Sequence, residues 1–140
     1  MRRFFRSPMF RVVLVALIPL LGIGRSAAQD YPFEMAKKNP AAMRAWQAIT
    51  PKTYKNEAWI NKLDGTASQM DQVTLHNKLF FRGSACKPHD CGGNSVAFLI
   101  AKDGSEAYGQ LNSENLSVSG YYFGAPDAET RQLLKAILEN

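Results

Sequence analysis

One short run, residues 95–101, constrains the fold more than any other part of the sequence. It reads Ser-Val-Ala-Phe-Leu-Ile-Ala and is almost continuously apolar. A strand with one solvated face alternates apolar and polar residues, whereas a strand buried on both faces can be apolar throughout. The run therefore predicts a central β-strand with protein packed against both of its faces.

Four further segments show strand patterns, and short polar connections separate them. The pair His76-Asn77 fits the turn of a hairpin, and we expect His76 to be a solvated turn residue. Apolar residues that alternate with serines near the C-terminal end are typical of a half-buried strand. With the central run, these segments predict an antiparallel sheet of about five strands; they are residues 72–75, 78–83, 106–111 and 116–123.

Helix patterns lie before and after the strands. The Asn-Pro pair at 39–40, followed by apolar residues at a spacing near 3.6, predicts a helix that ends before Pro51. Residues 56–63 and 127–138 predict two more helices, while residues 29–38 have few periodic apolar positions and are expected to be extended. This order predicts an α+β fold in which the helices pack on one face of the antiparallel sheet.

Residues 1–28 have the three-part layout of a secretory signal peptide. Arginines come first, an apolar run spans residues 12–23, and small residues follow at 26–28. A membrane-spanning helix needs about 20 apolar residues, so this run is too short to act as a membrane anchor. We expect cleavage after it, export from the cytosol, and one mature domain of residues 29–140, a length that suits a single core.

Removal of this segment changes the charge of the chain. The full sequence has 17 Lys and Arg residues against 12 Asp and Glu residues. Five of the arginines and none of the acids lie within residues 1–28, so residues 29–140 carry 12 charges of each sign. A neutral mature chain argues against a basic surface of the kind that binds nucleic acid or anionic membranes.

Residues 84–94 form a polar island between two of the predicted strands. The island holds both cysteines of the chain, Cys86 and Cys91, and outside the cytosol two cysteines most simply form one disulfide. The bridge and Pro88 would make the loop rigid, and a rigid loop loses little entropy when it binds. The island is therefore predicted to be a protruding, disulfide-closed loop at the tip of a hairpin.

The residues between the two cysteines carry the chemistry of the island. Lys87 and His89 are donors, Asp90 is an acceptor, and an imidazole can become cationic near neutral pH. Two neighbouring carboxylates favour the cationic form of an imidazole and hold it in place. The loop thus suits an acidic cleft, such as the paired carboxylates of a glycosidase.

The sequence Cys-Lys-Pro-His-Asp-Cys at residues 86–91 resembles the signature loop of the Ivy family, the inhibitors of vertebrate lysozyme. The resemblance extends from about residue 41 to residue 115. It implies a periplasmic bacterial protein, not an enzyme, that blocks C-type lysozyme when its disulfide-closed loop enters the active-site cleft. His89 would bond to the two catalytic carboxylates, and Asp90 would add polar contacts there. The other positions that match the motif are Lys87, Pro88, Cys86 and Cys91.

Other interpretations of the island stay open at this point. A secreted binding module could regulate the bacterium's own lytic transglycosylases, which act on the same peptidoglycan. Cys86, Cys91 and His89 could instead hold zinc or serve thiol chemistry, or the disulfide could only staple a loop. The sequence also leaves open whether the chain forms a homodimer. No nucleophile–base pair, phosphate loop or metal motif occurs elsewhere, so we expect no catalytic residue, cofactor or metal.

Overall fold

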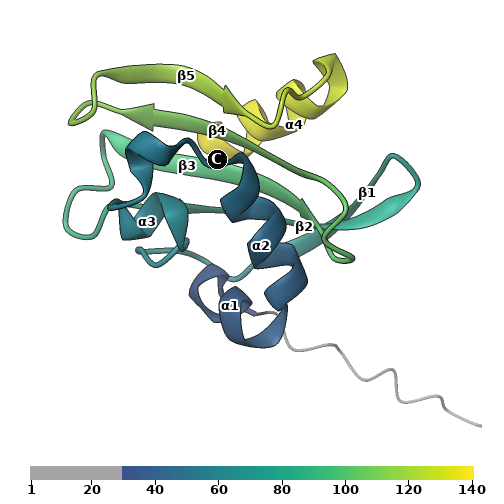
Figure 1. Cartoon of the computed structure of the whole chain (residues 1–140). Coiled ribbons are helices and arrows are strands. Elements are labelled where there is room, and N and C mark those ends of the chain that lie inside the picture. The colour runs from purple at the N-terminus through teal and green to yellow at the C-terminus, as the bar shows by residue number, and fades with distance from the viewer. Residues whose placement is uncertain (1–29) are drawn as a thin grey trace, which may run out of the picture.

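The computed structural model describes residues 30–140, and the predicted signal peptide at residues 1–28 lies outside this part of the chain. The centre of the fold is one five-stranded sheet in which every strand pairs antiparallel with the next strand in sequence (Figure 1). This meander confirms the predicted antiparallel sheet. The strands are β1 (Asp71–Leu75), β2 (Lys78–Cys86), β3 (Asn94–Ala101), β4 (Ala107–Ser113) and β5 (Val118–Phe123).

Four α-helices accompany the sheet in residues 30–140, which confirms the α+β class. The expectation of an extended segment before Pro40 is wrong, because a 3-10 turn at Pro32–Glu34 leads into a helix whose Met35 is fully buried. No helix in this part of the chain is long and apolar enough to cross a membrane. The helices are α1 (Met35–Lys38), α2 (Pro40–Ile49), α3 (Ala58–Asn61) and α4 (Ala128–Glu139).

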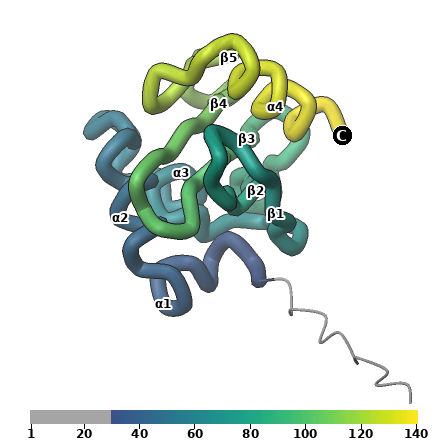
Figure 2. The backbone as a smooth tube through the Cα atoms, turned by 90° about the vertical axis from the view of Figure 1, so that its right-hand side faces the viewer, coloured from purple at the N-terminus to yellow at the C-terminus, as the bar shows by residue number. Residues whose placement is uncertain are grey.

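The central strand β3 is buried on both faces, as its apolar sequence predicts. The even-numbered side chains from 96 to 100 join the core under α1, α2 and α3, whereas the odd-numbered side chains from 97 to 101 join a second core under α4. Figure 2 shows α2 and α4 on opposite sides of the strands. One detail of the prediction is therefore corrected: α4 covers the other face, because β3 presents a second apolar face that Leu134 closes.

Trp46 anchors α2 to the sheet. Its ring is fully buried, packs against Phe98 and Phe123, and donates from Nε1 to the carbonyl oxygen of Ile60 at 2.7 Å. Gly109 of β4 lies under the ring, where a Cβ atom would come within 2.6 Å of it. The helical layer and the sheet therefore meet at a close contact that a larger residue at 109 would break.

The β2–β3 and β1–β2 connections lie at opposite ends of the sheet. The β2–β3 hairpin pairs Cys86 with Ser95, and the connection beyond them is seen at the left of Figure 1. The β1–β2 turn, which carries His76, is seen at the right. The predicted island of residues 84–94 is thus at a hairpin tip, at the opposite end of the sheet from His76.

Candidate functional site

Residues 87–90 make a tight turn at the end of this hairpin. The amide of Asp90 donates to the carbonyl oxygen of Lys87 at 3.0 Å, with Pro88 at the second position and His89 at the third. His89 has φ 63°, in the left-handed region that the third position of a type II turn requires. A side chain there costs about 1–2 kcal/mol. Surrounding contacts must therefore hold the turn in this conformation.

The turn offers its side chains to solvent. Pro88, His89 and Asp90 are exposed, and Lys87 is half-buried. In residues 30–140, the side-chain hydrogen bonds and ion pairs include both ring nitrogens of His76 but neither nitrogen of His89. The His89 imidazole is thus available to an external partner.

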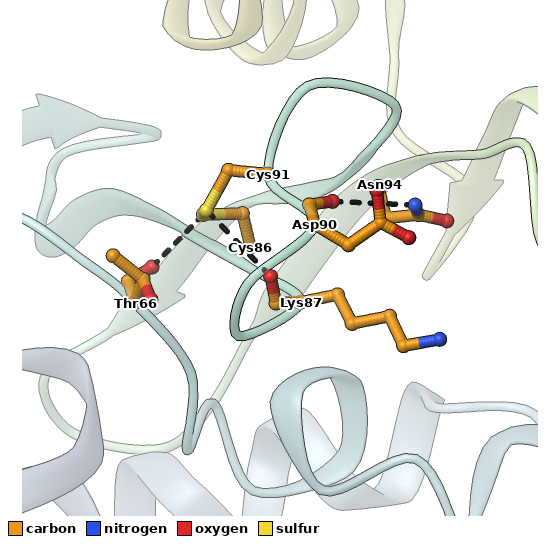
Figure 3. Close-up of a disulfide and its surroundings, with 6 residues drawn as sticks. All are labelled: Thr66, Cys86, Lys87, Asp90, Cys91 and Asn94. Carbon is orange, nitrogen blue, oxygen red and sulfur yellow. Dashed lines mark hydrogen bonds between the residues drawn. A yellow bond between two sulfur atoms is a disulfide. The ribbon is translucent and has the colours of Figure 1, made fainter.

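A disulfide closes the loop between Cys86 and Cys91, whose Cα atoms are 4.9 Å apart (Figure 3). The sulfur of Cys86 lies 3.4 Å from the Thr66 carbonyl oxygen, and that of Cys91 lies 3.6 Å from the Lys87 carbonyl oxygen. Bridged sulfurs have no proton to donate, so these are polar contacts rather than hydrogen bonds. Zinc is held by thiolates. In this structure both sulfurs are in the bridge, so neither is a thiolate that could bind zinc.

Asn94 holds the base of the loop and is only 1% exposed. Its side-chain Nδ2 donates to the main-chain carbonyl oxygen of Asp90 at 3.3 Å. Its main-chain carbonyl oxygen accepts from the amide of Lys87 at 3.0 Å. Both ends of the turn are thus bonded to one buried residue. Sequence reasoning missed Asn94, although a polar residue directly before a buried strand is a signal that could have found it.

His76 lies away from this site and is an exposed turn residue, as expected, but it also has two carboxylate partners. Its Nδ1 bonds to Glu106 and its Nε2 to Asp127, each at 2.9 Å. The two carboxylates, Glu106 first, raise the pKa of His76. These partners were not predicted because the turns β1–β2 and β3–β4 and the start of α4 meet here, which no local pattern around residue 76 reveals.

Comparison with known proteins adds to this geometry. A family model described as "Inhibitor of vertebrate lysozyme (Ivy)" matches residues 41–122, more than half of the chain. A Pseudomonas aeruginosa protein named "Inhibitor of vertebrate lysozyme" is 29% identical over 126 residues, which cover 81% of this chain and 82% of that protein. An Escherichia coli K12 protein of the same name is 26% identical over 105 residues, 75% of this chain and 66% of that protein.

The family match includes the whole hairpin that carries the loop. It also extends past residue 115, where the resemblance to the signature motif and its flanks ended, to residue 122 within β5. A further P. aeruginosa protein, described only as uncharacterised, is 24% identical over 143 residues, 94% of this chain and 92% of that protein. The resemblance suggested by residues 86–91 is confirmed: the chain belongs to the Ivy family.

Proposed function

We propose that this protein is an inhibitor of C-type lysozyme and acts by placing residues 86–91 in the active-site cleft of the enzyme. The observation that carries the proposal is the exposed turn with His89 at its tip, closed by a disulfide, in a chain of this family. Two of the relatives reported above are named as inhibitors, which also supports a role in binding rather than in catalysis.

The chemistry of the turn suits that cleft. A lysozyme active site pairs a carboxylic acid with an ionised carboxylate. The imidazole of His89 has two nitrogens that can bond to the two groups. Lys87 adds a positive charge beside it. Pro88 and the bridge lower the entropy lost when the loop enters the cleft.

The charge of the domain predicts how the complex forms. Residues 29–140 carry 12 charges of each sign. Without a strong net charge, association is not steered over long distances and runs at about 10⁵–10⁶ M⁻¹s⁻¹. Affinity then rests on the fit of the loop, and salt changes the association rate little. In this proposal the chain is exported by its leader and protects peptidoglycan in the periplasm.

The test compares two histidine variants, since the chain has only these two histidines. His89→Ala removes the imidazole at the loop tip, and His76→Gln removes the one at the other end of the sheet. We expect His89→Ala to weaken inhibition of a C-type lysozyme by about a hundredfold or more, because hydrogen bonds to charged groups are the strong ones. His76→Gln should inhibit like the wild type.

The readout is clearance of a cell-wall suspension by lysozyme, with circular dichroism to confirm that both variants fold. The wild-type protein is run in parallel against G-type and I-type lysozymes and a lytic transglycosylase. Selective inhibition of the C-type enzyme supports the proposal. Full inhibition by folded His89→Ala would reject His89 as the main contact, and inhibition of the transglycosylase alone would reject lysozyme as the target.

A further inference from the structure

The β4–β5 connection, residues 114–117, lies beside the loop and bonds to it. The amide of Glu114 donates to the carbonyl oxygen of Gly93 at 2.8 Å. The amide of Asn115 donates to Oδ1 of the buried Asn94 at 3.2 Å, and the hydroxyl of Ser113 donates to the same oxygen at 2.6 Å. The connection is therefore attached to the base of the loop at several points.

A further bond reaches the turn itself. The side-chain Nδ2 of Asn115 donates to Oδ2 of Asp90 at 3.2 Å, across 25 positions of sequence. On its other side, the carbonyl oxygen of Asp90 accepts from Nδ2 of Asn94. Asp90 is thus bonded through both its side chain and its main chain to residues of the same protein (Figure 3 shows the Asn94 bond).

The hydrogen bonds to Asp90 restrain the backbone conformation of the turn, which the disulfide alone does not set. The bridge joins residues 86 and 91 and restricts the distance between them, but it does not by itself select the left-handed conformation of His89. His89 occupies the left-handed region, which a non-glycine residue avoids unless its surroundings favour it. Asp90 follows His89 directly, so fixing Asp90 fixes the turn that presents the imidazole.

We propose that Asn94 and Asn115 are positioning residues for His89, and that the carboxylate of Asp90 serves as their acceptor inside the protein rather than as a contact with the target. The inhibition readout of this inference rests on the proposed function. A second readout, on the free protein, does not.

The proposal is tested by exchanging the donor, Asn115, and the acceptor, Asp90, of the bond between them. Asn94 is buried and its replacement endangers the fold, whereas Asp90 and Asn115 are both exposed. Asp90→Asn keeps an oxygen that can accept from Asn115. Asn115→Asp puts a second carboxylate against Asp90. The double variant Asp90→Asn/Asn115→Asp restores one donor and one acceptor with their places exchanged.

We expect lysozyme inhibition to fall about tenfold in Asn115→Asp and to return to within about threefold of wild type in the double variant. Asp90→Asn alone should change it by less than about threefold. Ser119→Asp, which adds the same charge at an exposed position of β5, controls for charge and should have no effect. A strong loss in Asp90→Asn that the double variant does not repair would assign Asp90 to the target and overturn the proposal.

Amide hydrogen exchange of Lys87 in the free protein gives the independent readout, since this amide donates to Asn94. Its protection should drop in Asn115→Asp and recover in the double variant, with the global unfolding midpoint unchanged. Unchanged protection in Asn115→Asp would reject the positioning role whatever the inhibition data show. Failure of the wild type to inhibit lysozyme, with the exchange pattern as expected, would reject only the proposed function.

Discussion

Thr66 and Cys86 exchange both of their backbone hydrogen bonds, from Thr66 N to Cys86 O at 3.1 Å and from Cys86 N to Thr66 O at 2.9 Å. This isolated antiparallel bridge fastens the segment after α3 to the first cysteine of the loop. Cys86 also pairs with Ser95 of β3 on its other side. The base of the loop is therefore held between two backbones, which makes it a continuation of the sheet rather than a free arm.

Gly65→Ala should destabilise the fold through this bridge. A Cβ atom at residue 65 would overlap the carbonyl oxygen of Cys86 and would meet Cβ of Trp59 at 3.0 Å. We expect a loss of about 1–3 kcal/mol in the free energy of unfolding, measured by urea denaturation. Thr66→Ala is the matched control, because it keeps both backbone bonds, and it should change the free energy by less than about 0.5 kcal/mol. Equal effects of the two substitutions would show that the close approach does not matter.

Removal of the disulfide should affect inhibition more than stability. A bridge that closes so short a ring contributes roughly 2 kcal/mol to folding. The variant Cys86→Ser/Cys91→Ser should therefore stay folded, with a lower urea midpoint, while its inhibition of lysozyme weakens because the loop loses preorganisation. The wild type treated with a reductant should behave in the same way. Unchanged inhibition in both samples would mean that the bridge does not prepare the loop for binding.

Trp46→Phe should destabilise the fold more than Trp59→Phe. The first substitution leaves the buried carbonyl oxygen of Ile60 without its donor and opens a small cavity beside Gly109. Together these effects predict a loss of about 2–4 kcal/mol in the free energy of unfolding. Trp59 bonds only to the side chain of Glu57, which is partly exposed. A larger loss for Trp59→Phe in the same denaturation series would contradict this ranking.

The cluster around His76 should make stability depend on pH. Glu106 and then Asp127 raise the pKa of His76, so its contribution is complete below about pH 6.5 and is lost as pH rises through the raised folded value. Hydrogen bonds from Thr130 and then His76 lower the pKa of Asp127 to about 2. That carboxylate contributes above about pH 4 and its contribution is lost as pH falls toward 2.

The difference in urea midpoint between wild type and His76→Gln should therefore be largest near pH 5–6 and smaller at pH 9. Lys78, Asp103 and Tyr108 also face the cluster. The charges of Lys78 and Asp103, and the hydrogen bond that the Tyr108 hydroxyl donates to Glu106, shift its titration without reversing this direction. Lys135→Gln, which breaks an exposed helical ion pair with Glu139, serves as the control for general charge effects. A difference that grows from pH 6 to pH 9 would contradict the assigned protonation of His76.

Several elements could be predicted because their signals are local. α2 begins at Pro40 and ends at Ile49, as the Asn-Pro start and the following Pro51 indicate. Other boundaries differ for reasons beyond the local sequence. The predicted strand 78–83 extends to Cys86 because its pairing with β3 continues to Ser95. The predicted helix 56–63 is shorter, with α3 ending at Asn61 and Leu63 in the left-handed region.

The candidate site also has some features that the local sequence predicts and others that depend on the fold. The sequence by itself determined which residues lie between the two cysteines, favoured a disulfide between them, and predicted that the loop with His89 lies at a hairpin tip. These features depend on neighbours in the chain and on the pattern of the two flanking strands. Only the tertiary structure decided what holds the ring. Asn115 meets Asp90 across 25 positions, and His76 meets Asp127 across 51. Such bonds depend on the register of the sheet and on the turns that the sheet brings together. The sequence around a side chain therefore does not indicate a partner so far along the chain.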